Sequence, residues 1–443
     1  MRLRLSEMTA PASGQLRGPD VEVGGLAIDS RLVKPGDLFA ALPGSRVDGH
    51  EFVAQAVSAG AAAALVARAL DLDCPQLIVP DVLLAMGRIA SHWRQRLSLQ
   101  MVGITGSNGK TTVKEMTAAV LSAAGPTWST QGNYNNEIGL PLTLAALQPS
   151  HRYAVIEMGA ARAGDIRYLA KMARPQVGVV TNAGPAHLET MGSLEGVART
   201  KGEMYGALPP DGTAIINADD RFADFWRGLA DQRRILSFGL NQPADVSARY
   251  VNGGIQVSVA GREYPFRAAL PGRHNLMNVL TALSINLAFD LPVEPALRAL
   301  ESMHSLPGRL QRRRHADGWS LIDDTYNANP ASLYAGLQVL AENGQERWLV
   351  LGDMAELGPD SDKLHAEMGY SAADLGVRRL YCIGQASRHS CRTFGPGARH
   401  FASHEDLLET LRRELKPGVS CLVKGSRSMA MERVVKGLFE GEG

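Results

Sequence analysis

Residues 103–111 read Gly-Ile-Thr-Gly-Ser-Asn-Gly-Lys-Thr; they follow the apolar pair Met101-Val102 and precede a helix-compatible stretch from Val113 to Ala124. A strand, a glycine-rich turn, Gly-Lys-Thr and a helix in this order are typical of a phosphate-binding loop. In such a loop, backbone N–H groups and the helix N-terminus face phosphate oxygens, the lysine neutralises the β- and γ-phosphates, and the threonine hydroxyl ligates Mg2+. The stretch therefore predicts a nucleoside triphosphate site built from Gly106, Ser107, Asn108, Gly109, Lys110 and Thr111.

One position departs from the usual spacing of this loop. The spacing asks for glycine five residues before Gly109, and this chain has Ile104 there, with Gly103 and Gly106 on either side of that region. The alternative interpretation is a glycine-rich turn that ends in a surface lysine. The order of strand, loop and helix favours the phosphate-binding loop.

Length and composition narrow the class of protein. A chain of 443 residues is too long for one core and suggests two to four domains. The 46 basic and 45 acidic side chains give a formal charge of +1, so no global field recruits nucleic acid or a membrane surface. The one basic run, residues 312–314, fits a solvated face. The four cysteines form no Cys-x-x-Cys pair and are expected to be reduced thiols, and no signal peptide or membrane span is indicated, which predicts a cytoplasmic protein.

The pattern of apolar runs predicts an α/β protein of three units, with boundaries at residues 1–97, 98–306 and 307–443. The first unit has a strand-like run at 37–42 and an alanine-rich helix at 52–62. Short apolar runs that end in polar or glycine residues occur in the second unit at 153–157 and 177–182, and in the third at 321–324, 348–353, 380–384 and 421–425. Such runs, alternating with helical segments, predict buried parallel sheets, with ligands at the carboxyl ends of the strands.

Three residues of the central unit are candidates for the chemistry of this site. Glu157 ends a predicted strand, where a carboxylate suits Mg2+, although a capping or salt-bridging glutamate has the same pattern. His187 follows the next strand through a Gly-Pro turn and is a candidate ligand. Lys201 lies in a helix-compatible segment, 194–208, and from its pattern alone is expected to be a solvated lysine.

Further candidates lie towards the third unit. Asn275 and Asn278, near the start of a predicted helix, have amide side chains suited to an adenine edge, although helix capping explains a single asparagine equally well. The segment 323–330, Asp-Asp-Thr-Tyr-Asn-Ala-Asn-Pro, follows a strand, where paired carboxylates indicate function and an asparagine-rich turn accounts for part of the composition. Arg309 is placed to reach a transferring phosphate from across a domain boundary, or else forms a surface salt bridge.

Together these segments resemble the Mur ligase family, which builds the peptide of bacterial cell-wall precursors. The resemblance covers nearly the whole chain. It includes the phosphate-binding loop, because the family's own pattern also lacks glycine at the position of Ile104. Within the family, residues 323–330 and 351–358 are most similar to the members that attach D-alanyl-D-alanine, and the Asp-Asn-Pro-Arg motif typical of the third-residue ligase is absent. The other segments that carry the resemblance are 29–31, 35–39, 48–50, 105–112, 132–139, 157–159, 182–189 and 201–203.

The resemblance implies three domains with separate tasks: the first binds a uridine nucleotide substrate, the second binds ATP, and the third, Rossmann-like, receives the dipeptide and closes over ATP. It implies that Lys201 is carbamylated and helps His187 to hold a second Mg2+, while Thr111 and Glu157 serve the Mg2+ beside the triphosphate. It adds Thr112, Asn275, Asn278, Arg309 and Asp324 to the nucleotide site, Asp324 at the ribose. Substrate-binding candidates are Ser30, Arg31, Asp48, Gly49, His50, Asn135, Asn136, Tyr326, Asn327 and Asn329.

The activity implied is ATP-driven amide formation between UDP-N-acetylmuramoyl-tripeptide and D-alanyl-D-alanine by a monomer, through an acyl phosphate. Lys110, Glu157, His187, Lys201 and Arg309 are the expected catalytic residues. The alternatives within the superfamily are the third-residue ligase and a folylpolyglutamate synthetase, which resembles only the later two units. A switch ATPase with a protein partner is an alternative of another class, and a catalytically silent binding protein conflicts with the intact Lys110, Thr111 and Glu157.

Overall fold

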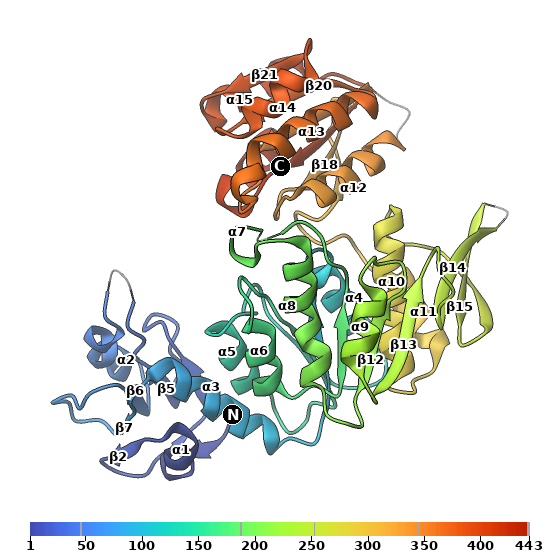
Figure 1. The fold of residues 1–443 in the computed structure, drawn as a ribbon. Helices are drawn as coiled ribbons and strands as arrows, with labels where there is room; N and C mark the ends of the chain where they lie inside the picture. Colours follow the sequence, from blue (N-terminus) through green and yellow to red (C-terminus); the bar gives the residue numbers. More distant parts are fainter. Residues whose placement is uncertain (45–46, 187, 252, 343–345, 441–443) are drawn as a thin grey trace.

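The computed structural model describes residues 1–44, 47–186, 188–251, 253–342 and 346–440. It is an α/β structure with one mainly parallel sheet in each of three successive parts of the chain, as the sequence predicts. Figure 1 shows the three parts in chain order, blue, green to yellow, and orange to red. Among the helices in the described ranges, none has the length and apolar character that a membrane span requires.

The first sheet has five strands in the order β2-β7-β6-β5-β4, of which β4 to β7 are parallel. The predicted helix at 52–62 is shorter than expected: a 3-10 turn at Gly49–Phe52 precedes α2 at Val53–Ser58, and the chain turns at Gly60, which has φ +106°. A short ribbon pairs β1 (Leu3–Arg4) with β3 (Glu22–Val23). The bounds in this unit are α1 Leu5–Ala12, β2 Gln15–Arg17, β4 Gly25–Ala27, β5 Asp37–Ala40, β6 Ala63–Val66, β7 Gln76–Ile78 and α3 Val82–Gln95.

The central sheet has nine strands in the order β16-β15-β14-β13-β12-β11-β8-β10-β9. Strands β8 to β14 pair in parallel, whereas β14, β15 and β16 form an antiparallel extension that the sequence patterns did not indicate. The strand bounds are β8 Gln100–Thr105, β9 Thr127–Ser129, β10 Tyr153–Glu157, β11 Val177–Val180, β12 Thr213–Asn217, β13 Arg234–Gly239, β14 Val246–Val251, β15 Gly254–Val259 and β16 Arg262–Phe266.

Two helical layers cover this sheet and form its two cores. Val113 and Met116 of α4 pack with Leu280 of α10 on one face, and Leu169 of α6 packs with Met204 of α8 on the other. Because both faces are covered, the parallel strands read as unbroken apolar runs. The helix bounds are α4 Lys110–Ser122, α5 Gly139–Ala145, α6 Asp165–Ala173, α7 Leu188–Met191, α8 Leu194–Ala207, α9 Ala223–Ala230, α10 Arg273–Ala288 and α11 Val293–Glu301.

The third sheet has the order β17-β18-β22-β19-β20-β21 and is parallel except for the edge strand β17. Strand β17 contains the basic run 312–314, in which Arg312 and Arg314 are exposed while the Arg313 guanidinium lies over the Phe439 ring. The bounds are β17 Gln311–Arg314, β18 Ser320–Asp324, α12 Pro330–Ala341, β19 Glu346–Gly352, α13 Ser361–Asp374, β20 Val377–Ile383, α14 Ser387–Phe394, β21 Ala398–Phe401, α15 His404–Glu414, β22 Val419–Lys424 and α16 Glu432–Phe439.

Candidate active site

The phosphate-binding loop, residues 106–109, joins the end of β8 to the start of α4. Gly106 has φ +144°, and a Cβ there would lie 2.0 Å from the Thr181 hydroxyl, so this turn needs glycine at that position. The Ser107 hydroxyl exchanges hydrogen bonds with the backbone of Gly184, and the Asn108 carbonyl accepts one from the Thr181 hydroxyl at 2.6 Å. The loop is therefore held by the segment that follows β11, at the carboxyl end of the sheet.

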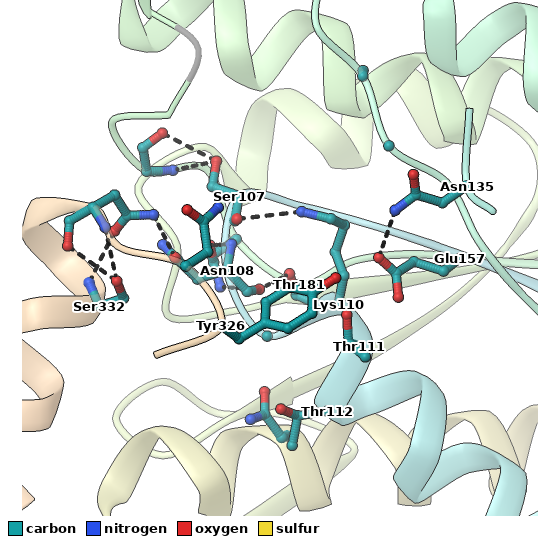
Figure 2. Close-up of a pocket in the computed structure, with 18 of the residues that line it drawn as sticks. Ser107, Asn108, Lys110, Thr111, Thr112, Asn135, Glu157, Thr181, Tyr326 and Ser332 are labelled. Atoms are coloured by element: carbon teal, nitrogen blue, oxygen red, sulfur yellow. Dashed lines mark hydrogen bonds between the residues drawn. The ribbon is translucent and has the colours of Figure 1, made fainter. Parts of the chain in front are cut away.

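Lys110 and Thr111 begin α4, with Glu157 beside them at the end of β10 (Figure 2). The Lys110 ammonium donates to the carbonyls of Gly106 and Ser107, at 2.7 and 3.3 Å. Burial lowers the pKa of Lys110, while the Glu157 carboxylate acts in the opposite direction. The predicted triphosphate loop and its acidic neighbour are thus adjacent in space.

Glu157 is a buried carboxylate whose two oxygens differ. Glu157 is only 2% exposed, and its Oε1 accepts a hydrogen bond from the Asn135 amide at 2.8 Å. Oε2 is buried and has no hydrogen-bond partner among the described residues. A buried carboxylate oxygen without a partner is costly, so this atom suits a bound cation.

Lys201 differs from the expectation drawn from its pattern alone, which was a solvated lysine. It is 1% exposed, and its ammonium makes one long hydrogen bond, 3.4 Å, to the carbonyl of Ala160. Burial, followed by the charge of Lys110, lowers the pKa of Lys201 to about 7. The helical pattern failed here because it does not show that this face of α8 packs against the segment that contains Ala160. His187, its predicted companion, lies outside the described residues.

The third unit contributes the opposite wall of the site. With the described residues Arg309 forms no salt bridge, the alternative considered from sequence; its guanidinium lies over the Tyr326 ring, 4.0 Å from the centroid. Asp324 forms a salt bridge with Lys424, which also donates to the carbonyl of Asn327 at 3.0 Å. The sequence reasoning missed Lys424 as a site residue, although a lysine that ends a buried apolar strand was the available signal.

Two asparagines of α10 lie beneath the phosphate-binding loop. The Asn275 amide donates to the carbonyl of Pro271 at 2.7 Å, and the Asn278 amide donates to Asn275 Oδ1 at 3.2 Å. Asn278 Oδ1 would be 2.7 Å from a Cβ at Gly109, so α10 and the loop approach closely. Burial lowers the pKa of the neighbouring His274.

A cavity of about 1280 Å³ collects most of the predicted residues. It lies between the central and third units and also reaches Leu83 and Leu84 of α3 in the first unit. Gly106 and Lys201 are not among its lining residues. The predicted residues that do line it are Ser107, Asn108, Gly109, Lys110, Thr111, Thr112, Asn135, Asn136, Glu157, Asn275, Asn278, Arg309, Asp324, Tyr326, Asn327 and Asn329.

The predicted residues of the first unit lie apart from this cavity. Ser30 donates to the side chain of Gln55, and the Arg31 side chain, 80% exposed, pairs with Asp29 at 2.6 Å. Asp48 caps the turn at Gly49–Phe52, and its carboxylate lies 2.6 Å from the His50 ring, which in turn accepts from the backbone N–H of Ala67. These contacts order two loops near the ends of β4 and β5.

Known protein families and relatives match nearly the whole length of the chain. Models of the Mur ligase family, catalytic domain, the Mur ligase middle domain and the Mur ligase, glutamate ligase domain match residues 22–94, 104–285 and 308–427. The UDP-N-acetylmuramoyl-tripeptide--D-alanyl-D-alanine ligase of Escherichia coli (strain K12) is 41% identical over 98% of each chain.

Solved structures give the same result. A MurF crystal structure from Acinetobacter baumannii has a TM-score of 0.93 at 33% identity and covers 99% of both chains. The MurF ligase from Thermotoga maritima, solved in complex with ADP, has a TM-score of 0.83 at 28% identity and covers 94% of this chain and 96% of that one. Because the three domain models match most of the chain and a relative 41% identical covers 98% of it, the chain belongs to the Mur ligase family.

Proposed function

We propose that this chain is an ATP-dependent ligase that joins D-alanyl-D-alanine to UDP-N-acetylmuramoyl-tripeptide in cytoplasmic peptidoglycan precursor synthesis. One observation carries the proposal: one cavity is lined by residues 107–109 of the phosphate-binding loop on one side and by Asp324 and residues 326–329 on the other. The relatives that match over the whole chain are named for this reaction. The proposed site residues come from one chain, so a monomer suffices.

Each unit has a separate task in this proposal. Residues 1–97 bind the uridine nucleotide through Ser30, Arg31 and the turn at 48–50; the Arg31 guanidinium pairs with Asp29 and is largely exposed, so a phosphate can reach its outer face. Residues 98–306 bind ATP. Residues 307–443 receive the dipeptide. The cavity reaches Leu83 and Leu84 of α3, which gives the tripeptide of the first substrate a route to the phosphate-binding loop, past Asn135 and Asn136.

The reaction has two steps, the first at the γ-phosphorus of ATP and the second at the acyl carbon of the tripeptide. The terminal carboxylate oxygen of the tripeptide attacks the γ-phosphorus of ATP; the bond to the bridging oxygen breaks, and ADP leaves as an acyl phosphate forms. The amine of D-alanyl-D-alanine then attacks the acyl carbon, loses a proton and expels inorganic phosphate as the amide forms. Lys110 and Arg309 offset the charge of the transferring group, so the protein acts by positioning and electrostatics.

The residues around Glu157 fit Mg2+. The buried Oε2 of Glu157 lacks a partner among the described residues, and the Thr111 hydroxyl begins the adjacent helix, which matches the oxygen ligands that Mg2+ takes beside substrate phosphates. Bound Mg2+ supplies positive charge next to the β- and γ-phosphates. Glu157 and Thr111 are the residues that would hold it.

Lys201 is the proposed site of carbamylation. A lysine must be uncharged to react with carbon dioxide, and burial favours that form by lowering the pKa to about 7. The product is an oxygen-bearing anion in place of a buried ammonium that has one long hydrogen bond. Together with His187, this carbamate would hold a second Mg2+.

The remaining assignments concern the base, the ribose and the dipeptide. Asn275 and Asn278, on α10 below the loop, are proposed to meet the adenine edge, and Asp324 the ribose. Tyr326, Asn327 and Asn329 are proposed to order the dipeptide. Thr112, which lines the cavity after Thr111, completes the nucleotide site.

A product assay tests the proposed function. The purified chain, ATP, Mg2+, UDP-N-acetylmuramoyl-tripeptide and D-alanyl-D-alanine are incubated, and the uridine-containing species are separated by mass. We expect a new species equal to the tripeptide substrate plus the dipeptide minus one water. L-alanyl-L-alanine serves as the control acceptor. A parallel incubation replaces the two substrates by UDP-N-acetylmuramoyl-dipeptide and a single amino acid. A product formed there and not with the tripeptide and D-alanyl-D-alanine would assign the chain to another ligase of the family.

A further inference from the structure

One hydrogen bond joins two loops that are 221 residues apart in sequence. The side-chain amide Nδ2 of Asn329 donates to Oδ1 of Asn108 at 2.7 Å. Asn108 belongs to the phosphate-binding loop of the central unit, and Asn329 ends the acceptor loop, residues 325–329, of the third unit. The bond therefore links the two sides of the cavity, the triphosphate site and the proposed dipeptide site.

The orientation of the Asn329 amide is fixed by its other contacts. Asn329 is the N-cap of α12: its Oδ1 accepts from the backbone N–H of Ser332 at 2.9 Å, and its own N–H donates to the Ser332 hydroxyl at 3.0 Å. Because the cap needs the oxygen on the helix side, the nitrogen faces Asn108. The crossing bond thus uses the half of the amide that the cap leaves available.

Both loops are anchored behind this bond. The Asn108 backbone N–H donates to Asn182 Oδ1 at 3.0 Å, and its carbonyl accepts from Thr181. On the other side, Lys424 donates to the carbonyl of Asn327 and the Ser426 hydroxyl to that of Ala328. Because each loop is held by these hydrogen bonds to its own unit, a displacement of one unit relative to the other strains the Asn108–Asn329 bond.

We infer that the Asn108–Asn329 pair is a positioning contact that couples occupation of the phosphate-binding loop to the placement of the acceptor loop. Neither side chain reacts. Because coupling between two binding sites is reciprocal, an arrangement of Asn108 favoured by bound nucleotide also favours the acceptor loop that receives the dipeptide amine. This inference rests on the proposed function of the cavity.

Three variants separate the crossing bond from the helix cap. Asn329→Ser keeps an N-cap side chain, because serine caps as well as asparagine, but is too short to reach Asn108. Asn108→Ala removes the acceptor from the other side. Ser332→Ala is the matched control: it removes the hydroxyl that accepts from the Asn329 N–H but keeps the backbone N–H that orients Asn329 Oδ1, so the crossing bond stays in place. Thermal unfolding of each variant checks that it is folded.

The test is a double-mutant cycle on ligation kinetics. We expect Asn329→Ser to raise the KM for D-alanyl-D-alanine roughly two- to tenfold, the effect of one neutral hydrogen bond, with a smaller change in kcat, and Ser332→Ala to stay near wild type. The double variant should lose no more than the larger single loss, because both changes remove one bond. Wild-type KM for the dipeptide in Asn329→Ser, or losses that multiply in the double variant, would overturn the inference. Absence of ligation by the wild-type chain would instead refute the proposed function.

Discussion

At the scale of single residues, Glu157 carries the sharpest electrostatic prediction. Glu157→Gln preserves the shape of the side chain and an oxygen for the Asn135 amide, but it removes the negative charge at the buried Oε2. We expect a folded protein whose kcat/KM for ligation falls about a hundredfold or more, a loss of a few kcal/mol in transition-state stabilisation. Glu294→Gln, an exposed carboxylate on α11, is the control. Near-normal turnover of Glu157→Gln would remove this residue from the site.

Lys201 distinguishes two interpretations: the solvated lysine expected from its helical pattern and the carbamate implied by the family resemblance. Lys201→Ala should stay folded and lose most of its activity, and added acetate or propionate should restore part of it by entering the vacated space. Lys171→Ala, an exposed lysine on α6, should change the rate little. Mass spectrometry under conditions that preserve carbamates should find one added carbon dioxide on the active wild type. Full activity of Lys201→Ala without added carboxylate would contradict the carbamate.

These two residues show what sequence predicts of a site and what it leaves open. Glu157 was predicted because a carboxylate at the end of a buried strand must lie at the carboxyl edge of the sheet. Lys201 was misassigned from its pattern because its burial depends on α8 meeting α6 and the segment after β10, where its ammonium donates to the Ala160 carbonyl. The stacking of Arg309 on Tyr326 was missed for the same reason, since it joins segments whose contact no local pattern encodes.

At the scale of elements, α13 holds the loop after β19 through one histidine. His365 is fully buried; its Nε2 accepts from the backbone N–H of Met354 at 2.9 Å and its Nδ1 lies 2.8 Å from the Ser361 carbonyl. Burial lowers the pKa of His365 and the charge of His389 adds to this, while the Ser361 carbonyl and the carboxylates of Asp353 and Asp362 act against it. The folded protein therefore favours the neutral ring.

The sign of the resulting pH dependence follows from proton uptake. Below the ordinary histidine value of about 6.5, the unfolded chain binds more protons than the folded one, so this contribution to stability is present above that pH and is lost as pH falls towards the lowered value. Between about pH 8 and about pH 5.5, the drop in unfolding temperature should be smaller for His365→Gln than for wild type. The exposed His304→Gln variant should behave as wild type. Equal drops in all three proteins would contradict the assignment.

Elements with strong local patterns were predicted well, and those that depend on pairing were not. The run at 153–157 coincides with β10, and the run at 321–324 lies within β18, because buried parallel strands are continuous apolar segments. Strands β14 to β16 mix exposed and buried residues, and their antiparallel pairing extends a sheet whose other strands pair in parallel. Their membership of the central sheet depends on pairing with β13, which no pattern within 246–266 records.

At the scale of the whole molecule, the first unit is predicted to affect one substrate and not the other. Arg31→Ala should raise the KM for UDP-N-acetylmuramoyl-tripeptide and leave the KM for ATP nearly unchanged, because the residue lies outside the ATP cavity and its guanidinium, paired with Asp29, is exposed at the surface of the first unit. Steady-state kinetics with each substrate varied in turn measure this. A change confined to the KM for ATP would show that the division of tasks among residues 1–97, 98–306 and 307–443 is wrong.

The most direct measurement for the molecule as a whole is phosphate release with ATP, UDP-N-acetylmuramoyl-tripeptide and D-alanyl-D-alanine, omitting each in turn. If the cavity joins a triphosphate site to an acceptor site, sustained release requires all three substrates and matches the amount of ligated product mole for mole. Omission of either the tripeptide or the dipeptide should reduce sustained phosphate release to background. Phosphate release that continues at the full rate without the tripeptide and without the dipeptide would contradict ligation and indicate a nucleotide-hydrolysing switch protein.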